Sequence, residues 1–267
     1  VVLTNRAGGA IFDVPAAVVY TLQSVLNHDV TLGATPDGGV IKLGAGTLVL
    51  ANTQAYTGPT LVSNGTLEVT GTLPADAELL VEPEGALVLT APVGAALDVG
   101  SLSLGSASAA DAGLTLTADP GRFESGGALA VSGDLFLGKT AVTLLPRGST
   151  IAAVTNGTYV VMTCGGTLSG SAADLRLANG VFGKSYVFSV AGGEVLLTVA
   201  MATANAEIWA SATGGEWAEA GNWITPPGVG AVGMTIGFGQ AITGPPTVNL
   251  DGAVTAGNLL LNNPNAY

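Results

Sequence analysis

Basic side chains are scarce in this sequence, and charge of either sign is low. Charged residues make up 10% of the 267 positions, and seven Lys and Arg against nineteen Asp and Glu leave a net charge of −12. Ordinary globular proteins carry about 25% charged residues. The few basic residues are scattered and form no patch that could neutralise phosphates. The composition therefore argues against nucleic acids and anionic membrane surfaces as partners.

Cysteine and histidine occur once each, as Cys164 and His28. A single cysteine forms no intramolecular disulfide, and one His with one Cys cannot complete a typical zinc site. We interpret Cys164 as a small buried apolar residue, with a reactive or intermolecular thiol as the alternative. His28 lies beside Asp29, and we interpret it as a turn residue rather than as part of a Ser-His-Asp triad. We expect no metal and no cofactor.

Long apolar runs are missing as well. No stretch approaches the roughly 20 apolar residues that a membrane-spanning helix needs, so we expect no membrane insertion in this segment. The first residues lack the basic-then-apolar pattern of a signal peptide. If the protein is exported, its signal peptide is expected to lie outside these residues.

Short apolar alternations separated by turn residues are abundant instead. The chain has 40 glycines and 13 prolines, and 48% of its residues are hydrophobic. Strands of three or four residues are unstable as isolated hairpins. Stacked as rungs of a coil, each buries its inward residues against the neighbouring rungs. The pattern predicts an all-β fold, a right-handed parallel β-helix (solenoid) of short strands, with a β-sandwich as the alternative.

Residues 44–71, GAGTLVLANTQAYTGPTLVSNGTLEVTG, hold the clearest motif. Three short alternations, at 47–50, 60–62 and 66–69, are separated by turn residues. The segment resembles the autotransporter-associated β-strand repeat at Gly44, Gly46, Thr47, Leu48, Leu50, Tyr56, Gly58, Thr60, Val62, Gly65, Thr66, Leu67 and Val69. The resemblance implies a parallel β-helix in a bacterial cell-surface or secreted chain. It is specific for architecture and says little about chemistry.

The sequence predicts three parts. Residues 1–200 are expected to form the β-helix, 201–206 a linker of small residues, and 207–267 the start of a further β-helix module. This last part contains all three tryptophans and resembles the opening of another repeat module of such surface proteins. The tryptophans are expected either to close the end of a coil or to stack on sugar rings as a glycan site: Trp209, Trp217 and Trp223.

The two ends of the sequence read into one another as a continuous apolar alternation. We therefore predict end-to-end joining of units, in a tandem array or in a filament, with continuity from residue 267 to residue 1 of the next unit. The residues assigned to this self-assembly are Val1, Val2, Leu3, Leu259, Leu260, Leu261 and Tyr267.

Carboxylates are sparse, and the densest group is Asp76, Glu78, Glu82 and Glu84. We interpret the group as a solvated loop, with weak calcium binding and catalysis as alternatives. The chain is not expected to be an enzyme, and a β-helix carbohydrate-active enzyme is the least favoured interpretation. The leading hypothesis is a structural segment that forms a stalk or fibre outside the cell, with itself as partner. The alternative is an adhesin module that binds glycans or a host surface.

Overall fold

The computed structural model describes residues 2–107, 110–181 and 184–201, and in the C-terminal part 206–212, 215–217, 219–223, 235–238, 247–249 and 258–261. The chain divides into two compact units. The first comprises Val1–Gly180 and Tyr186–Val199, and the second comprises Val181–Ser185 and Ala200–Tyr267.

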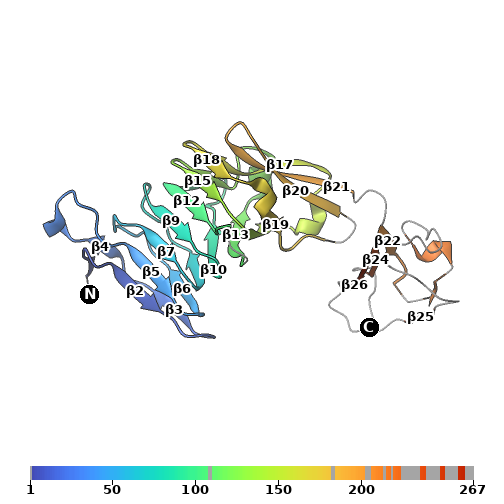
Figure 1. Cartoon of the computed structure of the whole chain (residues 1–267), viewed down its shortest axis with the longest axis horizontal. Coiled ribbons are helices and arrows are strands. Elements are labelled where there is room, and N and C mark those ends of the chain that lie inside the picture. Colours follow the sequence, from blue (N-terminus) through green and yellow to red (C-terminus); the bar gives the residue numbers. More distant parts are fainter. Residues whose placement is uncertain are drawn as a thin grey trace. The chain divides into compact units, whose positions relative to one another are not determined.

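In the first unit, each turn of the chain adds one strand to a parallel sheet of seven strands (Figure 1). Neighbouring strands of this first sheet belong to consecutive turns of the coil. Its strands are β2 (Ala10–Asp13), β5 (Val40–Leu43), β7 (Thr60–Val62), β9 (Glu78–Val81), β12 (Ser101–Leu104), β15 (Leu135–Leu137) and β18 (Leu168–Gly170).

A second parallel sheet also has seven strands. In each turn, the strand of the second sheet directly follows the strand of the first sheet, so the two sheets have the same order of turns. Its strands are β3 (Val19–Leu22), β6 (Thr47–Leu50), β8 (Gly65–Val69), β10 (Gly85–Thr90), β13 (Ala112–Ala118), β16 (Thr140–Pro146) and β19 (Leu175–Leu177).

A third face precedes the first sheet in the first three and the last three turns of the coil. Near the start it is formed by β1 (Leu3–Asn5) paired in parallel with β4 (Leu26–His28), followed by a parallel bridge between Asn27 and Ala55. Later turns place β11 (Leu97–Val99), β14 (Leu129–Val131) and β17 (Gly157–Cys164) side by side in parallel. Three faces in constant order make this unit a parallel β-helix, as predicted, and the parallel pairing excludes the β-sandwich. Parallel crossovers are right-handed in nearly all proteins.

An antiparallel hairpin follows the last complete turn. It consists of β20 (Lys184–Ala191) and β21 (Glu194–Met201), and β21 pairs antiparallel with β17. Gly192 and Gly193 connect the two strands with φ angles of 59° and 79°. A two-residue hairpin turn of this hand needs positive φ at both positions, which glycine adopts without strain. Short helical segments occupy the connections: η1 (Val30–Leu32), α1 (Pro120–Glu124), η2 (Ile151–Ala153) and η3 (Ala172–Asp174).

The core of this unit consists of apolar rows that cross the rungs. Successive side chains of a strand point to opposite faces, so every second residue enters the interior. Because successive rungs pair in register, equivalent positions of neighbouring rungs stack on one another. In the second sheet the inward row Leu48, Leu67, Leu87 and Leu114 is at most 1% exposed.

The motif at 44–71 contributes the strands β6, β7 and β8, and it packs tightly on its neighbours. Gly44 and Gly65 have φ angles of 71° and 67°. A Cβ on Gly65 would lie 2.4 Å from the carbonyl oxygen of Gly44. The motif glycines are thus required both by backbone conformation and by the close approach of successive turns.

The second unit also contains parallel strands. β22 (Ala206–Trp209), β24 (Thr235–Phe238) and β26 (Asn258–Leu261) form a parallel sheet, and β23 (Gly215–Glu216) pairs in parallel with β25 (Val248–Asn249). A 3-10 turn, η4 (Ala220–Asn222), lies between them in sequence. Within the described residues, no helix is both long and apolar enough to span a membrane.

Candidate functional site

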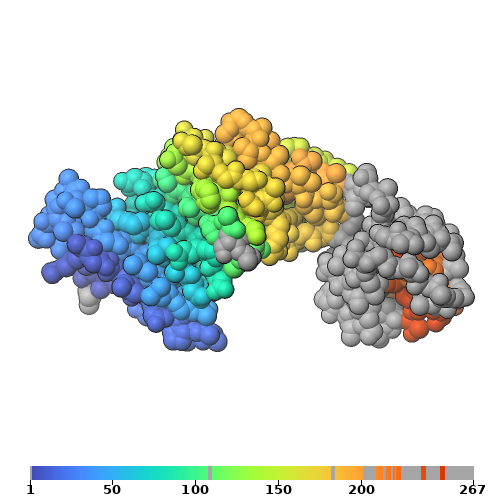
Figure 2. All heavy atoms as spheres, in the orientation of Figure 1, coloured from blue at the N-terminus to red at the C-terminus, as the bar shows by residue number. Residues whose placement is uncertain are grey.

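The first rung of the coil, formed by β1, β2 and β3, presents open strand edges. In the part of the chain that the structure describes, β2 and β3 are the outermost strands of their sheets (Figure 1). In the space-filling view, the N-terminal residues, in blue, form one end of the first unit (Figure 2). The carbonyl oxygen of Val18 accepts a hydrogen bond from Thr47 N in β6, and that of Leu22 accepts one from Ala51 N, directly after β6. Because bonding alternates along a parallel strand, the N–H and C=O groups of Val19 and Thr21 point toward the open edge.

Apolar side chains gather on the same rung. Ile11, Val19 and Tyr20 are 61%, 66% and 49% exposed. Tyr20 occupies the inward row whose next member, Leu48, is fully buried. Its ring lies 6.2 Å from that of Phe12, and the two rings only partly cover the end of the interior. The first rung therefore offers both unpaired backbone groups and an incompletely covered apolar row.

A buried carboxylate, Asp37, holds the N-terminal turns together. Its Oδ1 accepts hydrogen bonds from Asn5 Nδ2 at 3.0 Å, Gly39 N at 2.9 Å and Gly58 N at 3.1 Å. Its Oδ2 accepts one from Thr57 N at 2.9 Å. Burial opposes ionisation, but these donors prevail and lower the pKa of Asp37 below its usual value. One carboxylate thus links β1 to two later turns.

His28 belongs to the same polar group, referred to below as the Asp37 cluster. Its Nδ1 lies 3.1 Å from Asp37 Oδ2 and 2.9 Å from the Thr57 hydroxyl, while Nε2 lies 3.1 Å from the carbonyl oxygen of Gly33. A catalytic triad needs the hydroxyl and the carboxylate on opposite nitrogens of the ring. Here both lie at Nδ1. The arrangement is that of a structural histidine.

Lys42 is the one basic residue in the interior of the described coil, stacked between Phe12 and Val62. Its Nζ donates to the carbonyl oxygens of Leu43, Gly44 and Asn64 at 2.7, 2.6 and 3.1 Å. Burial lowers the pKa of Lys42, which the charge of Asp13 opposes. All three ammonium donors are used at the corner between the first and second sheets, so Lys42 has a structural role.

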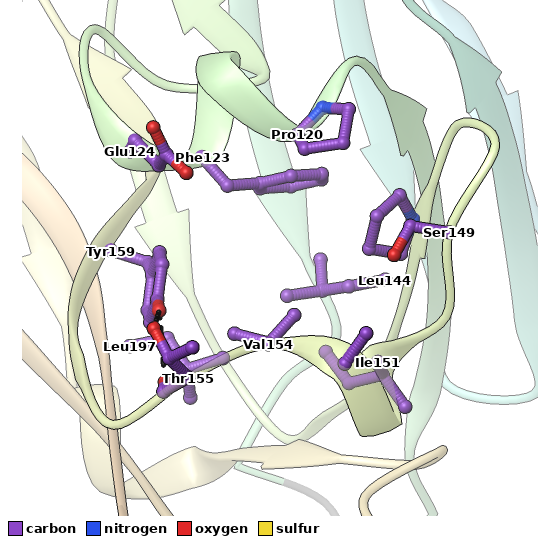
Figure 3. Close-up of a pocket in the computed structure, with 12 residues that line it drawn as sticks. Pro120, Phe123, Glu124, Leu144, Ser149, Ile151, Val154, Thr155, Tyr159 and Leu197 are labelled. Carbon is purple, nitrogen blue, oxygen red and sulfur yellow. Dashed lines mark hydrogen bonds between the residues drawn. The ribbon is translucent and has the colours of Figure 1, made fainter.

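A pocket of about 130 Å³ lies beside helix α1 (Figure 3). Its walls include the side chains of Phe123, Leu144 and Val154. Tyr159, also on the wall, donates its hydroxyl hydrogen to the carbonyl oxygen of Thr155 at 2.8 Å. The lining of the pocket is mainly apolar, and Glu124 and Tyr159 are its two titratable residues.

The carboxylates that form the densest group in the sequence, at residues 76–84, do not share one environment in the structure. The side chain of Glu82 accepts a hydrogen bond from the Ser63 hydroxyl, whereas Glu84 lies in a turn with a φ of 72°. Among the described residues, no three His, Cys, Asp or Glu side chains come together as a metal site. Cys164 is half-buried and continues the inward row of Val99 and Val131.

The three tryptophans form the core of the second unit together with Phe238. Trp209 is fully buried and Trp223 nearly so, and Trp217 packs against them partly exposed. The ring centroids of Trp223 lie 5.0 Å from Trp209 and 4.7 Å from Trp217, both edge to face. Trp223 Nε1 donates to the carbonyl oxygen of Trp217 at 2.8 Å. Burial leaves no free ring face on Trp209 or Trp223 for a sugar.

The residues assigned to self-assembly are only partly described. Val2 is exposed, and Leu3 begins β1 opposite Leu26. The backbone of residues 259–261 belongs to β26 and pairs with β24. Val1 and Tyr267 lie outside the described residues. The joining of the two ends stays a prediction.

Sequence reasoning missed Tyr20, the Asp37 cluster and Lys42. The apolar alternation around Tyr20 resembles that of every other strand, and only the stacking order shows that this rung is outermost. Asp37 lies in the turn sequence Pro-Asp-Gly-Gly, where aspartate is common for local reasons. Lys42, a charged residue within the apolar alternation 40–43, is the one feature of the sequence that indicates a polar residue in the core.

The fold defines the class of this protein as a parallel β-helix solenoid. Residues 40–69 match the family model of the passenger-associated-transport-repeat. The predicted resemblance to a repeat of autotransporter passenger domains is therefore confirmed for this segment, and the repeat implies an extracellular or surface location. No curated protein matches the sequence of this chain.

Proposed function

We propose that this chain is a structural segment of a bacterial cell-surface or secreted repeat protein and that it acts as part of a shaft, not as an enzyme. The exposed first rung carries the proposal, because it ends a continuous hydrogen-bonded ladder with open edges and an apolar row. The rungs transmit load through parallel backbone hydrogen bonds and through the inward leucine and valine rows.

The partner of the first rung is a further β-helix rung, from another segment of the same polypeptide or from a second copy. Another rung would bond to the free groups of Val19 and Thr21 and cover the ring of Tyr20. Open parallel edges with exposed apolar residues pair readily with other strands. Parallel strands lie about 4.8 Å apart, so a stacked rung would continue the ladder without a break.

Proline at position 21 tests this proposal. Thr21→Pro removes an N–H that points away from β6, so the existing ladder should survive while docking is lost. Thr21→Ala keeps the N–H and serves as the matched control. Hydrogen exchange of the Val19 and Thr21 amides gives the direct readout. These amides should exchange fast in the dilute 267-residue chain and slowly in the native full-length protein.

Fast exchange of both amides in the native protein would show that nothing pairs with this edge, and the proposal would then fail. The same conclusion would follow if Thr21→Pro, introduced into the native protein, left the exchange of Val19 as slow as in the Thr21→Ala control. Circular dichroism of both variants verifies that the coil itself remains folded.

A further inference from the structure

The outward side chains of the first sheet change along the coil from aliphatic residues to serine and phenylalanine. Its outward row starts with Ile11, Ile41, Leu61 and Leu80, which follow one another in register. The row then continues with Ser103, Phe136 and Ser169 on β12, β15 and β18. An exposed aromatic ring thus lies between two serines on successive rungs.

Phe136 is 37% exposed. Neighbouring strands place Ser103 and Ser169 about 4.8 Å to either side of it along the ladder. Within the described residues, neither the Ser103 nor the Ser169 hydroxyl has a hydrogen-bond partner. A flat ring flanked by two free hydroxyls matches the two sides of a sugar ring: apolar C–H groups on its face and hydroxyls at its edge.

A second row lies two residues earlier in sequence: Glu78 and Ser101 begin β9 and β12, whereas Asp134 and Thr167 directly precede β15 and β18. Asp134 lies roughly 6.6 Å from Phe136 along the strand direction, given the rise per residue of an extended chain. Asp134 Oδ1 accepts a hydrogen bond from Thr167 N at 2.7 Å, and Asp134 N donates to Ser101 Oγ at 3.2 Å. The backbone and side chain of Asp134 are therefore held in place.

Thr167 N bonds to Oδ1, and within the described residues the other carboxylate oxygen of Asp134, Oδ2, accepts no hydrogen bond. The hydroxyl hydrogen of Ser101 is also available, because its oxygen is the acceptor in the bond with Asp134 N. Together the two rows enclose a groove of about 240 Å³ whose lining includes Phe136, Asp134 and Ser103.

We propose that this groove binds a neutral carbohydrate chain, with one sugar ring stacked on Phe136. The negative face of an aromatic ring attracts polarised C–H groups of the sugar. Asp134 Oδ2 accepts a hydrogen bond from a sugar hydroxyl, and Ser103 or Ser169 bonds at the opposite side of the sugar. Glu78 and Asp134, in a chain of net charge −12, repel anionic polysaccharides and nucleic acids. The proposal is independent of docking at the first rung.

Affinity electrophoresis of the intact 267-residue chain tests the proposal. The gels contain dextran, amylose, a mixed-linkage β-glucan or a galactomannan, with polygalacturonate as the anionic counter-probe. At least one neutral polymer should retard the chain. Phe136→Ala should weaken retardation about tenfold, as loss of one stacking contact implies. Phe136→Tyr should restore it. Leu145→Ala, at a residue 44% exposed on the outer face of β16, should leave it unchanged.

Three results would overturn the proposal. The first is that no neutral polymer retards the chain. The second is that polygalacturonate alone retards it. The third is retardation that survives Phe136→Ala but is lost in Trp217→Ala, which would place the binding in the second unit. Far-UV circular dichroism of each variant shows that the comparison is made between folded proteins.

Discussion

Replacing Asp37 by alanine should unfold the N-terminal turns of the coil well before the remaining turns. The carboxylate is the common acceptor for Asn5 Nδ2 and for the backbone N–H groups of Gly39, Thr57 and Gly58. Its removal leaves these donors without their acceptor, and His28 loses its carboxylate partner. No neighbouring carboxylate can take over, because each donor points into the buried centre of the cluster.

The expected loss is about 4 kcal/mol for the N-terminal turns. A buried donor without an acceptor costs about 1–3 kcal/mol. The costs of the four donors do not add fully, because water can enter beside the exposed Thr57 and the half-buried His28 once the carboxylate is gone. Loss of one partner of a buried ionic group costs about 3–5 kcal/mol in other proteins. Asp98→Ala is the control, because Asp98 lies exposed on the outward side of β11, and we expect a change below about 0.5 kcal/mol.

Hydrogen exchange as a function of urea concentration measures this effect turn by turn. In a solenoid each turn contacts only its neighbours, so local instability can remain local. Amides of β1 to β6 should lose protection at lower urea in Asp37→Ala, whereas those of β13 and β16 should keep the wild-type profile. A uniform loss of protection along the coil, or a change no larger than that of Asp98→Ala, would refute the reasoning.

The same cluster should respond to acid. The folded state lowers the pKa of Asp37 below its ordinary value of 3.8, because hydrogen-bond donors favour the charged form. Its contribution to stability is therefore complete above about pH 3.8 and is lost as the pH falls below that value. Asp37→Ala should flatten this part of the acid unfolding profile of the N-terminal turns.

Three further predictions concern the core. Leu87→Ala should lower the free energy of unfolding by about 3 kcal/mol in urea titrations, since Leu87 is fully buried; Val88→Ala, on the outward side of β10, should cost less than about 1 kcal/mol. Burial raises the pKa of Tyr56 from 10.0 to about 12. The free energy of unfolding should therefore fall as the pH rises from 10.0 to about 12, and Tyr56→Phe should make this fall smaller by roughly 2–3 kcal/mol. Trp209→Ala should shift the tryptophan fluorescence transition to lower urea while the far-UV transition of the first unit stays unchanged.

The sequence was sufficient to predict the β-helix because the inward rows require little beyond alternation. In 47–50 and 66–69, a leucine or valine at every second position is buried, and the motif glycines occupy turns that only small residues fit. The stacked parallel sheets follow from these local patterns, since strands so short gain stability only by stacking.

The candidate sites could not be predicted in the same way. Phe136 is flanked by Leu135 and Leu137, and the alternation alone cannot distinguish an outward aromatic from a core residue. Ser103, Phe136 and Ser169 are each 33 residues apart in sequence, as the register pairs show, so their proximity depends on the length of each turn. Turn length is set by the connections, which carry no periodic signal. The same holds for Asp37, whose partners come from three different turns.

Electron cryo-microscopy of the native full-length protein tests the central claim most directly. If the chain is part of a stacked shaft, density beyond β1, β2 and β3 should continue as further parallel strands about 4.8 Å away, with the ring of Tyr20 covered. Density that ends at β1 to β3, with Tyr20 facing solvent or a cap that is not a β-rung, would contradict the claim.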